Sequence, residues 1–265
     1  MNQLNVTMVQ TELVWESPAD NRQHFDDLFK GLFDDLLDKD LESDLIVLPE
    51  MFSTGFSMDS SRLAESMDGV TVGWMLDKAA TLGITVCGSI IIQDDGGYFN
   101  RFLWAQPDGT IKHYDKRHLF RMSSENDHYF AGEEKLVVEL KGFRICPQIC
   151  YDLRFPVWSR NHEGIDLLIY VANWPAVRRD HWISLLKARA IENLCYVVGL
   201  NRIGTDGNNV SYSGDSVARD FNGAPLLEMG LRNDINTVTL NKQPLVEYRE
   251  HFPAHLDADR FTIDP

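Results

Sequence analysis

Three residues with complementary chemistry, a thiol, a carboxylate and an amine, each follow a short apolar segment of the chain. Cys150 follows the run 143–149, Glu50 follows Leu48-Pro49, and Lys116 follows the run 111–114 closely. A thiol is a nucleophile for acyl transfer, a carboxylate can take its proton, and an ammonium stabilises the oxygen of a tetrahedral intermediate. Together they predict a cysteine-dependent hydrolase that needs neither a metal nor an organic cofactor.

Each of the three residues also has an ordinary structural explanation. A free cysteine is commonly buried and inert, a glutamate after a strand can cap a helix, and most lysines lie in solvated loops. The three residues together favour the catalytic interpretation that none supports alone, since ligands in open α/β sheets bind beyond the carboxyl ends of the strands. The backbone N–H of Tyr151, just past such an end, then completes an oxyanion site.

Composition limits the partners and the compartment. The 265 residues are 44% hydrophobic and 25% charged, which is ordinary for a soluble globular protein, and we expect a single domain over residues 1–265. A net charge of −15 argues against nucleic acid and anionic membranes as partners. We find no signal peptide and no membrane-spanning run, so we expect a cytoplasmic protein whose four cysteines are free thiols.

Strand-like and helix-like segments alternate through most of the chain, in two halves with no low-complexity linker between them. This pattern predicts an α/β fold in which two sheets pack face to face with helices outside, a four-layer α-β-β-α sandwich. From Lys242 the periodicity is weak, and we expect a tail that wraps over the surface or reaches a neighbouring subunit. The expected strands are 4–10, 45–48, 84–92, 98–105, 111–114, 143–149, 166–171 and 195–200, with two short strands within 213–227; the expected helices are 21–37, 70–82, 157–163 and 182–193.

Ordered motifs around the three residues resemble those of the nitrilase superfamily of carbon–nitrogen hydrolases. The matching stretches are Leu48-Pro49-Glu50-Met51-Phe52, Tyr114-Asp115-Lys116-Arg117-His118-Leu119-Phe120, Ile149-Cys150-Tyr151-Asp152-Leu153-Arg154-Phe155-Pro156, Ala172-Asn173-Trp174-Pro175 and Arg189-Ala190-Ile191-Glu192-Asn193. The resemblance runs from the first strand to about Leu240. It implies the α-β-β-α fold, with Glu50 as base, Lys116 as transition-state stabiliser and Cys150 as nucleophile.

The resemblance also implies a second acid in the loop between the lysine and the cysteine. Glu125 is the candidate, since relatives carry a similar glutamate before Pro-Gly, where this chain has Ala131-Gly132. A second departure is Gly214-Asp215-Ser216, where many relatives have Gly-His-Ser. Asp215 is therefore expected near the rim of the site.

Within the superfamily the chain looks most like the ω-amidases, which hydrolyse the terminal amide of 2-oxo dicarboxylic acid monoamides such as 2-oxoglutaramate and 2-oxosuccinamate. The partners of the protein are then a small amide substrate and water. An apolar wall of Phe52, Phe56, Tyr151 and Trp174 would enclose the substrate, and Asn173 is a further candidate for binding it. Arg154 is a candidate ligand of the substrate carboxylate, although it could instead pair with an acid beneath the site. Arg178 and Arg179 are the next candidates. The resemblance further implies a homodimer or larger homo-oligomer.

Other functions remain open from the sequence. Within the same chemistry, the substrate could be another amide, a nitrile, or an N-carbamoyl or ureido compound. A cysteine–histidine hydrolase would use His113 or His118, although no motif around Cys150 matches such an enzyme. A non-catalytic binding module is the third alternative, and the intact set of Glu50, Lys116 and Cys150 argues against it.

Overall fold

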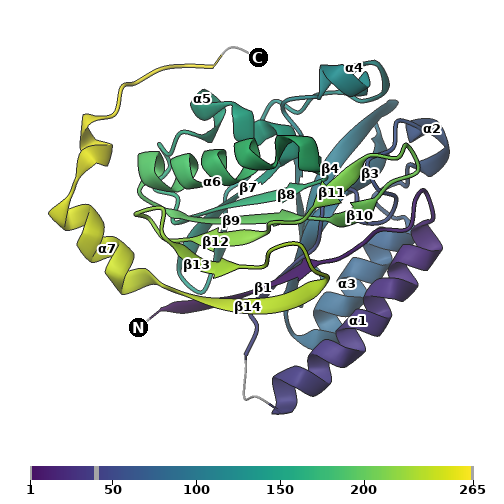
Figure 1. Ribbon diagram of the computed structural model, residues 1–265, viewed down its shortest axis with the longest axis horizontal. Helices are drawn as coiled ribbons and strands as arrows, with labels where there is room; N and C mark the ends of the chain where they lie inside the picture. The colour runs from purple at the N-terminus through teal and green to yellow at the C-terminus, as the bar shows by residue number, and fades with distance from the viewer. Residues whose placement is uncertain (1, 39–41, 264–265) are drawn as a thin grey trace.

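Two six-stranded sheets pack face to face, with helices on their outer sides (Figure 1). The structure, a computed structural model, describes residues 2–38 and 42–263. The strand order of the first sheet is β14 (Asp234–Asn241), β1 (Gln3–Gln10), β2 (Leu45–Val47), β3 (Thr85–Asp94), β4 (Gly97–Ala105) and β5 (Ile111–Asp115). That of the second is β13 (Pro225–Glu228), β12 (Val217–Arg219), β9 (Tyr196–Asn201), β8 (Leu167–Ala172), β7 (Phe143–Ile149) and β6 (Val138–Leu140).

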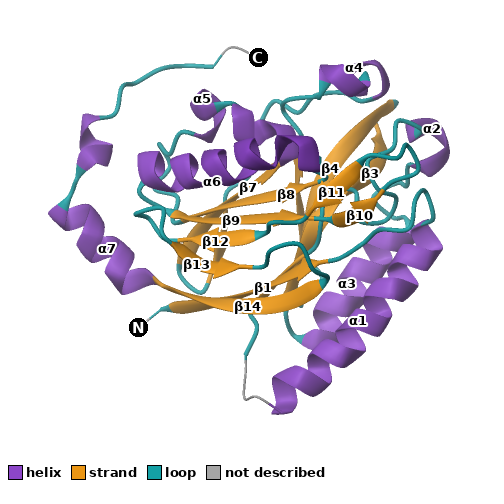
Figure 2. Cartoon of the chain, in the orientation of Figure 1, coloured by secondary structure: helices purple, strands orange, loops and turns teal. Residues whose placement is uncertain are grey.

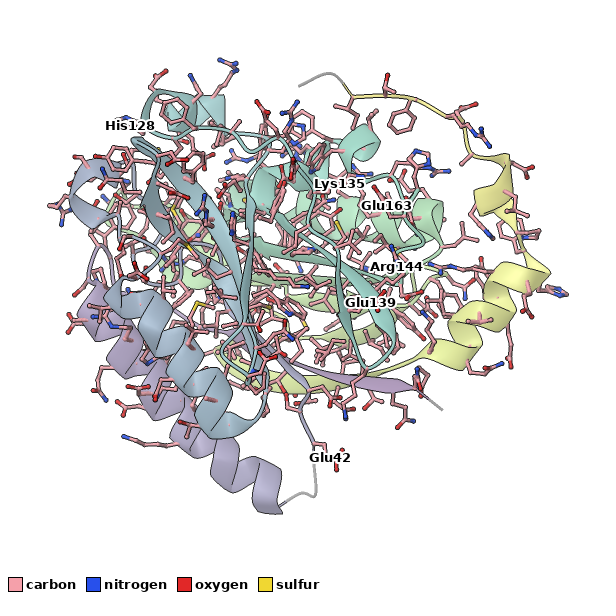
Figure 3. The ribbon with its side chains drawn as sticks, turned by 180° about the vertical axis from the view of Figure 1, so that it is seen from behind. Glu42, His128, Lys135, Glu139, Arg144 and Glu163 are labelled. Atoms are coloured by element: carbon pink, nitrogen blue, oxygen red, sulfur yellow. The ribbon has the colours of Figure 1, made fainter. Side chains whose placement is uncertain are left out.

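The helices form the two outer layers, as Figure 2 shows in purple. The long helices α1 (Pro18–Asp38) and α3 (Val70–Leu82) cover the first sheet, while α5 (Pro156–Ser159) and α6 (Arg179–Asn193) cover the second. Two short helices, α2 (Ser60–Leu63) and α4 (Glu125–His128), lie beside each other, and the Ser60 Oγ donates to the His128 carbonyl (Figure 3). A small hairpin of β10 (Ile203–Thr205) and β11 (Ser211–Ser213) stands apart from both sheets. These layers confirm the predicted α-β-β-α sandwich.

Alternation along each strand of the first sheet explains the layers. In β2 and the residue after it, Leu45 and Val47 join the core between the sheets, whereas Ile46 and Leu48 join the core beneath α1 and α3. Successive strand residues point to opposite faces, so an apolar run of this kind has to be covered on both sides. The core between the sheets contains residues of both, Trp104 from β4 among them.

Parallel strands place their carboxyl ends together. The order β1-β2-β3 is parallel in the first sheet, as is β7-β8-β9 in the second, and each step between them passes over an outer helix. Residues 95 and 96 between β3 and β4 both have positive φ, which is typical of a two-residue hairpin turn. Because of the parallel order in each sheet, the segments that follow β2, β7 and β8 meet at one edge of the sandwich.

Two predicted elements differ from the observed ones. The helix expected over 157–163 is reduced to α5, because Arg160 already leaves helical geometry at ψ 131°. The weakly periodic segment after Lys242 begins with a helix, α7 (Lys242–His251), whose Leu245 is buried. The chain then runs along the outside of the molecule (Figure 1), and Phe261 meets His162 with ring centroids 4.8 Å apart.

No helix within residues 2–38 and 42–263 combines the length and the apolar character needed to cross a membrane.

Candidate active site

Glu50, Lys116 and Cys150 converge where segments from the two sheets end. Glu50 lies just beyond β2, Lys116 directly after β5, and Cys150 directly after β7. The Lys116 Nζ donates to Glu50 Oε1 at 2.8 Å, and the Cys150 Sγ lies 4.0 Å from the carbonyl oxygen of Asn173, whose backbone N–H donates to Glu50 Oε2. Glu50 and Lys116 have no exposed surface, and Cys150 keeps 9% of its own. The structure thus brings together the three residues that the sequence singled out.

Donors surround the Glu50 carboxylate. Its Oε1 accepts from Lys116 Nζ and from the Asn100 side-chain amide, both at 2.8 Å. Its Oε2 accepts from the backbone N–H of Asn173, also at 2.8 Å. The Asn173 Nδ2 donates to the Glu50 carbonyl at 2.7 Å and fixes the backbone as well. These hydrogen bonds satisfy the buried carboxylate and fix its orientation in the site.

Lys116 is shared between two buried carboxylates. Its Nζ donates to both oxygens of Glu125, at 2.9 and 3.0 Å, and the Phe120 N–H donates to Glu125 Oε2 at 2.6 Å. Burial alone would lower the pKa of Lys116, but the charges of Glu125 and Glu50 outweigh it and raise that pKa above its ordinary value. Lys116 is therefore an ammonium. Burial raises the pKa of Glu125; the Lys116 charge opposes that rise and the Glu50 charge adds to it.

Cys150 occupies a strained turn at the end of β7. Its φ is +43°, in the left-handed region, and it starts the 3₁₀ turn Cys150–Arg154. Asp152 holds this turn, since its carboxylate accepts from the N–H groups of Ile149 and His118 and from the Tyr114 hydroxyl. Burial, and then the Glu50 charge, raise the pKa of the Cys150 thiol well above its ordinary value. The resting site therefore holds a thiol, which has to lose its proton during the attack.

Lys116 and Cys150 open onto a cavity of about 670 Å³, within the usual range for small-molecule sites, and Glu50 is buried behind them. Lys116 and Cys150 lie at its floor, and its aromatic wall is formed by Phe56, Phe120, Tyr151, Trp174 and Tyr212. The Phe56 ring lies over the Lys116 ammonium, 5.1 Å from ring centroid to Nζ. Asn173 also lines the cavity. The wall suits a short substrate with apolar methylene groups.

The site and the fold match a known family. The model of the carbon–nitrogen hydrolases matches residues 5–250. The chain belongs to the carbon–nitrogen hydrolase family. It is 47% identical over 265 residues to "Omega-amidase YafV" of Escherichia coli (strain K12), a match that covers 98% of each chain.

Two further relatives of this hydrolase are informative. A "2-oxoglutaramate amidase" of Bacillus subtilis is 36% identical over 220 residues, which cover 81% of this chain and 85% of that one. The crystal structure of XC1258 from Xanthomonas campestris, described as a CN-hydrolase superfamily protein with an arsenic adduct in the active site, superposes with a TM-score of 0.92. That protein is 46% identical, and the match covers all of both chains. The chain is accordingly an amidase of the carbon–nitrogen hydrolase family, as its motifs indicated.

The prediction that Phe52 forms part of the cavity wall is wrong. Phe52 does not line the cavity but is fully buried beneath α1 and α3, with its ring centroid 5.5 Å from Phe25 and 5.8 Å from Trp74. The reason is the turn after Glu50, where Met51 has a φ of +44° and the next side chain is directed into the core of the first sheet. Phe56, four residues later, supplies the wall instead.

The arginines predicted as ligands of the substrate carboxylate differ in where they lie relative to the cavity. Arg154 does not pair with an acid beneath the site; it lines the cavity, donates to His181 Nδ1 at 3.0 Å and lies over the Trp174 ring at 4.7 Å. Arg178 also lines the cavity and lies 5.3 Å from the Phe120 ring centroid. Among the residues that the structure describes, neither guanidinium has a carboxylate partner. Burial, and then the Arg178 charge, act to lower the pKa of Arg154.

Arg179 is occupied elsewhere. Its guanidinium makes two hydrogen bonds to Asp215, at 2.7 and 2.8 Å, and the Asp215 carbonyl accepts from Trp182 Nε1 at 3.0 Å. Asp215, which stands where many relatives have histidine, therefore joins the β11–β12 connection to the start of α6. It fastens the loop that carries Arg178 without itself lining the cavity.

A cysteine–histidine mechanism finds no support in this geometry. The described residues that line the cavity include no histidine. His113 lies exposed on β5, and the His118 ring bonds Asp152 at 2.8 Å and stacks on Phe155.

Asn100 was missed by the sequence analysis. It lies within β4 and is fully buried, yet its side chain reaches the Glu50 carboxylate. The polar pair Asn100-Arg101 between Phe99 and Phe102, inside a strand that is apolar from Phe102 to Ala105, was the signal that could have identified it, since a buried amide needs partners.

Proposed function

We propose that the protein is an ω-amidase, which hydrolyses the terminal amide of a short 2-oxo dicarboxylic acid monoamide, such as 2-oxoglutaramate or 2-oxosuccinamate, to the 2-oxo acid and ammonia. The observation that carries the proposal is the position of two cationic side chains, Arg154 and Arg178, on the wall of the cavity whose floor holds Cys150 and Lys116. A substrate that places an amide at the floor and a carboxylate at the wall would have the two functional groups of such a monoamide. The names of the relatives point to the same class.

Acylation begins with the Cys150 thiol. Its sulfur attacks the amide carbonyl carbon while its proton passes to the Glu50 carboxylate, and the carbonyl electron pair moves onto oxygen. The Lys116 ammonium and the backbone N–H of Tyr151 stabilise that oxyanion. Collapse of the tetrahedral intermediate breaks the carbon–nitrogen bond, the Glu50 proton moves to the leaving nitrogen, and ammonia departs from a thioester on Cys150.

In deacylation Glu50 acts on water instead of on the thiol. Glu50 takes a proton from water, the hydroxide oxygen attacks the thioester carbon, and the second tetrahedral intermediate expels the sulfur, which recovers its proton from Glu50. Because the resting Cys150 is a thiol, each half-reaction starts and ends with the same charge on the site. Glu125 keeps the Lys116 ammonium aimed at the oxyanion position, since it binds that ammonium through both oxygens.

The far end of the substrate meets the two arginines. Neither has a carboxylate partner among the described residues, and each is supported by an aromatic ring, Arg154 by Trp174 and Arg178 by Phe120. Two neighbouring guanidiniums without an acid between them favour an anion, because its charge relieves their repulsion. The substrate carboxylate would fill that place, with its methylene groups on the aromatic wall.

The test is a panel of substrates with release of ammonia as the readout. We expect 2-oxoglutaramate and 2-oxosuccinamate to give a kcat/KM at least about tenfold above that of a neutral amide of the same length, a nitrile or an N-carbamoyl amino acid, as a charged hydrogen bond of about 1.5–3 kcal/mol requires. Faster turnover of a nitrile or a carbamoyl compound would reject the proposed substrate and leave the site chemistry intact.

Two variants test the chemistry itself. Cys150→Ala should abolish hydrolysis with the fold unchanged, and Glu50→Gln should lower kcat by about 10²–10⁴, the usual contribution of a general base. Mass spectrometry of the intact wild-type protein, quenched with acid during turnover, should show an adduct of the acyl group at Cys150. Near-normal rates in either variant would contradict the scheme.

We also propose a homodimer or larger homo-oligomer, because the family resemblance implies it. Light scattering after size-exclusion chromatography would give the mass in solution, and a mass near the 30.3 kDa of one chain would contradict this assembly.

A further inference from the structure

Asn100 contacts both Glu50 and Lys116. Its side-chain Nδ2 donates to Glu50 Oε1 at 2.8 Å and lies 3.4 Å from Glu125 Oε1. Its backbone carbonyl accepts from the Lys116 N–H at 3.0 Å. One residue of β4 thus contacts the base through its side chain and the lysine through its backbone. The relative position of Glu50 and Lys116 depends on it.

A neighbouring hydroxyl decides which end of the Asn100 amide faces the carboxylates. The Met51 N–H donates to Ser89 Oγ at 2.9 Å, and Ser89 Oγ donates to Asn100 Oδ1 at 2.8 Å. A hydroxyl has one proton, so Ser89 accepts from the backbone and gives its proton to Asn100. The Asn100 Oδ1 is thereby occupied, and its NH₂ group has to face Glu50 and Glu125. All the side chains in this chain of bonds are fully buried.

The consequence concerns the two oxygens of Glu50. A carboxylate oxygen has two lone-pair directions in its plane. On Oε1 both are taken by short bonds of 2.8 Å, one from Lys116 and one from Asn100, whereas Oε2 accepts one short bond of 2.8 Å from the Asn173 N–H and a longer one of 3.4 Å from the Asn173 side-chain amide. A proton that leaves the Cys150 thiol therefore finds its place on Oε2.

We propose that Asn100, oriented by Ser89, is a positioning residue of the amidase reaction, which saturates Glu50 Oε1 and so directs the thiol proton of Cys150 to Glu50 Oε2. The proposal rests on the assignment of Glu50 as base made above. In the step itself the S–H bond breaks, the Oε2–H bond forms, and the sulfur electron pair forms the bond to the substrate carbon. Asn100 acts only through Glu50 and does not touch the substrate.

The charges around Glu50 predict what the isosteric change would do. Lys116, Glu125 and the Cys150 thiol face it, and the hydroxyls of Tyr129 and Tyr212 lie within its electrostatic influence. Asn100→Asp would place three carboxylates around one ammonium, and like charges at that distance force the group to bind a proton. The base would then be silenced at neutral pH and recover as the pH rises.

The experiment compares pH profiles of kcat and kcat/KM, with the best amide of the panel, for the wild type and the variants Asn100→Asp, Asn100→Ala and Ser89→Ala. We expect kcat at pH 7 to fall about 10²–10³-fold in Asn100→Asp and about 10–10²-fold in Asn100→Ala, with KM changed less than about threefold. The acid limb of the profile should move to higher pH, by about one unit or more in Asn100→Asp. Ser89→Ala should shift it in the same direction by less.

Asn193→Asp is the matched control. Asn193 is a buried asparagine at the end of α6 whose Oδ1 accepts from the Asn161 N–H, and it does not line the cavity. This variant should keep the wild-type profile, after correction for its folded fraction measured by circular dichroism. A folded Asn100→Asp protein with an unmoved acid limb, or a loss confined to KM, would overturn the proposal. If Glu50→Gln were also fully active, the proposed function itself would fail; an inactive Glu50→Gln beside a normal Asn100→Asp rejects only the role of Asn100.

Discussion

Lys116→Met removes the ammonium between two carboxylates that have no contact with solvent, and it should destabilise the fold as well as stop the reaction. In the intact protein the Lys116 Nζ lies 2.8 Å from Glu50 Oε1 and 2.9 Å from Glu125 Oε1. At an effective dielectric constant of about 20, each of these attractions is about 6 kcal/mol before desolvation is subtracted. Loss of one partner from a buried ion pair costs about 3–5 kcal/mol in measured cases. We expect the upper part of that range, because two carboxylates lose their partner.

The pH dependence distinguishes this cause from a packing defect. In the wild type, the pKa of Lys116 lies above its ordinary value, so its contribution to stability is complete at neutral pH and is lost only in strong alkali. In Lys116→Met the unpaired carboxylates bind a proton in the folded chain at a higher pH than in the unfolded chain, and burial already raises the pKa of Glu125. Lowering the pH from 7 to 5 should therefore narrow the difference in stability between the variant and the wild type.

The assay is urea denaturation followed by circular dichroism at pH 7 and pH 5, with ammonia release measured in parallel. Lys135→Met is the control, since the contacts of Lys135 are weaker: 3.2 Å to the Arg160 carbonyl, 3.4 Å to the partly exposed Glu163 (Figure 3), and 5.6 Å to the centroid of the Trp158 ring. It should lose about 1 kcal/mol or less. A Lys116→Met protein within about 1 kcal/mol of the wild type at pH 7, or a deficit that does not shrink at pH 5, would refute the charge argument.

Three further outcomes follow from the site. Arg178→Gln should lower kcat/KM for 2-oxoglutaramate by about 10–10²-fold and leave a neutral amide unaffected, as steady-state kinetics on both substrates would show. Alkylation of Cys150 by iodoacetamide, followed by mass spectrometry, should be slow at pH 7 and still rising above pH 9, because burial raises the thiol pKa; a plateau near neutrality would contradict this. Asp215→Asn, which weakens the pair with Arg179, should raise KM more than it lowers kcat, and a pure kcat loss would argue against its role in holding the Arg178 loop.

The layers of the fold could be predicted because local pattern and tertiary structure agree along most of the chain. Leu45–Val47 is too short and too apolar to be anything but a strand covered on both faces, and Gly83, at φ +67°, ends α3 where the sequence places a stop. In the segment after Pro156 the local pattern and the tertiary structure disagree. Its helical pattern is real for one turn, yet Arg160 donates to the Glu192 carbonyl at 2.6 Å and is drawn away from the helix by α6. A contact between residues so distant in sequence leaves no local signal.

Some residues of the site could likewise be predicted from the sequence, and others could not. Glu50, Lys116 and Cys150 could be predicted because each stands at the end of a segment, where the order of the chain already says that it meets the others. Phe52 could not be placed, since its direction depends on the left-handed turn at Met51, which a sequence without glycine there does not announce. Asn100 was hidden for a different reason. Its value to the reaction comes from Ser89 on the neighbouring strand, and the register that joins them, Ile91 opposite Asn100, is a property of the sheet. The residues that react can thus be identified by their position along the chain, whereas those that orient them can be identified only by their neighbours in space. Asn100 and Ser89 belong to the second group, and their variants should change kcat more than they change the stability of the fold.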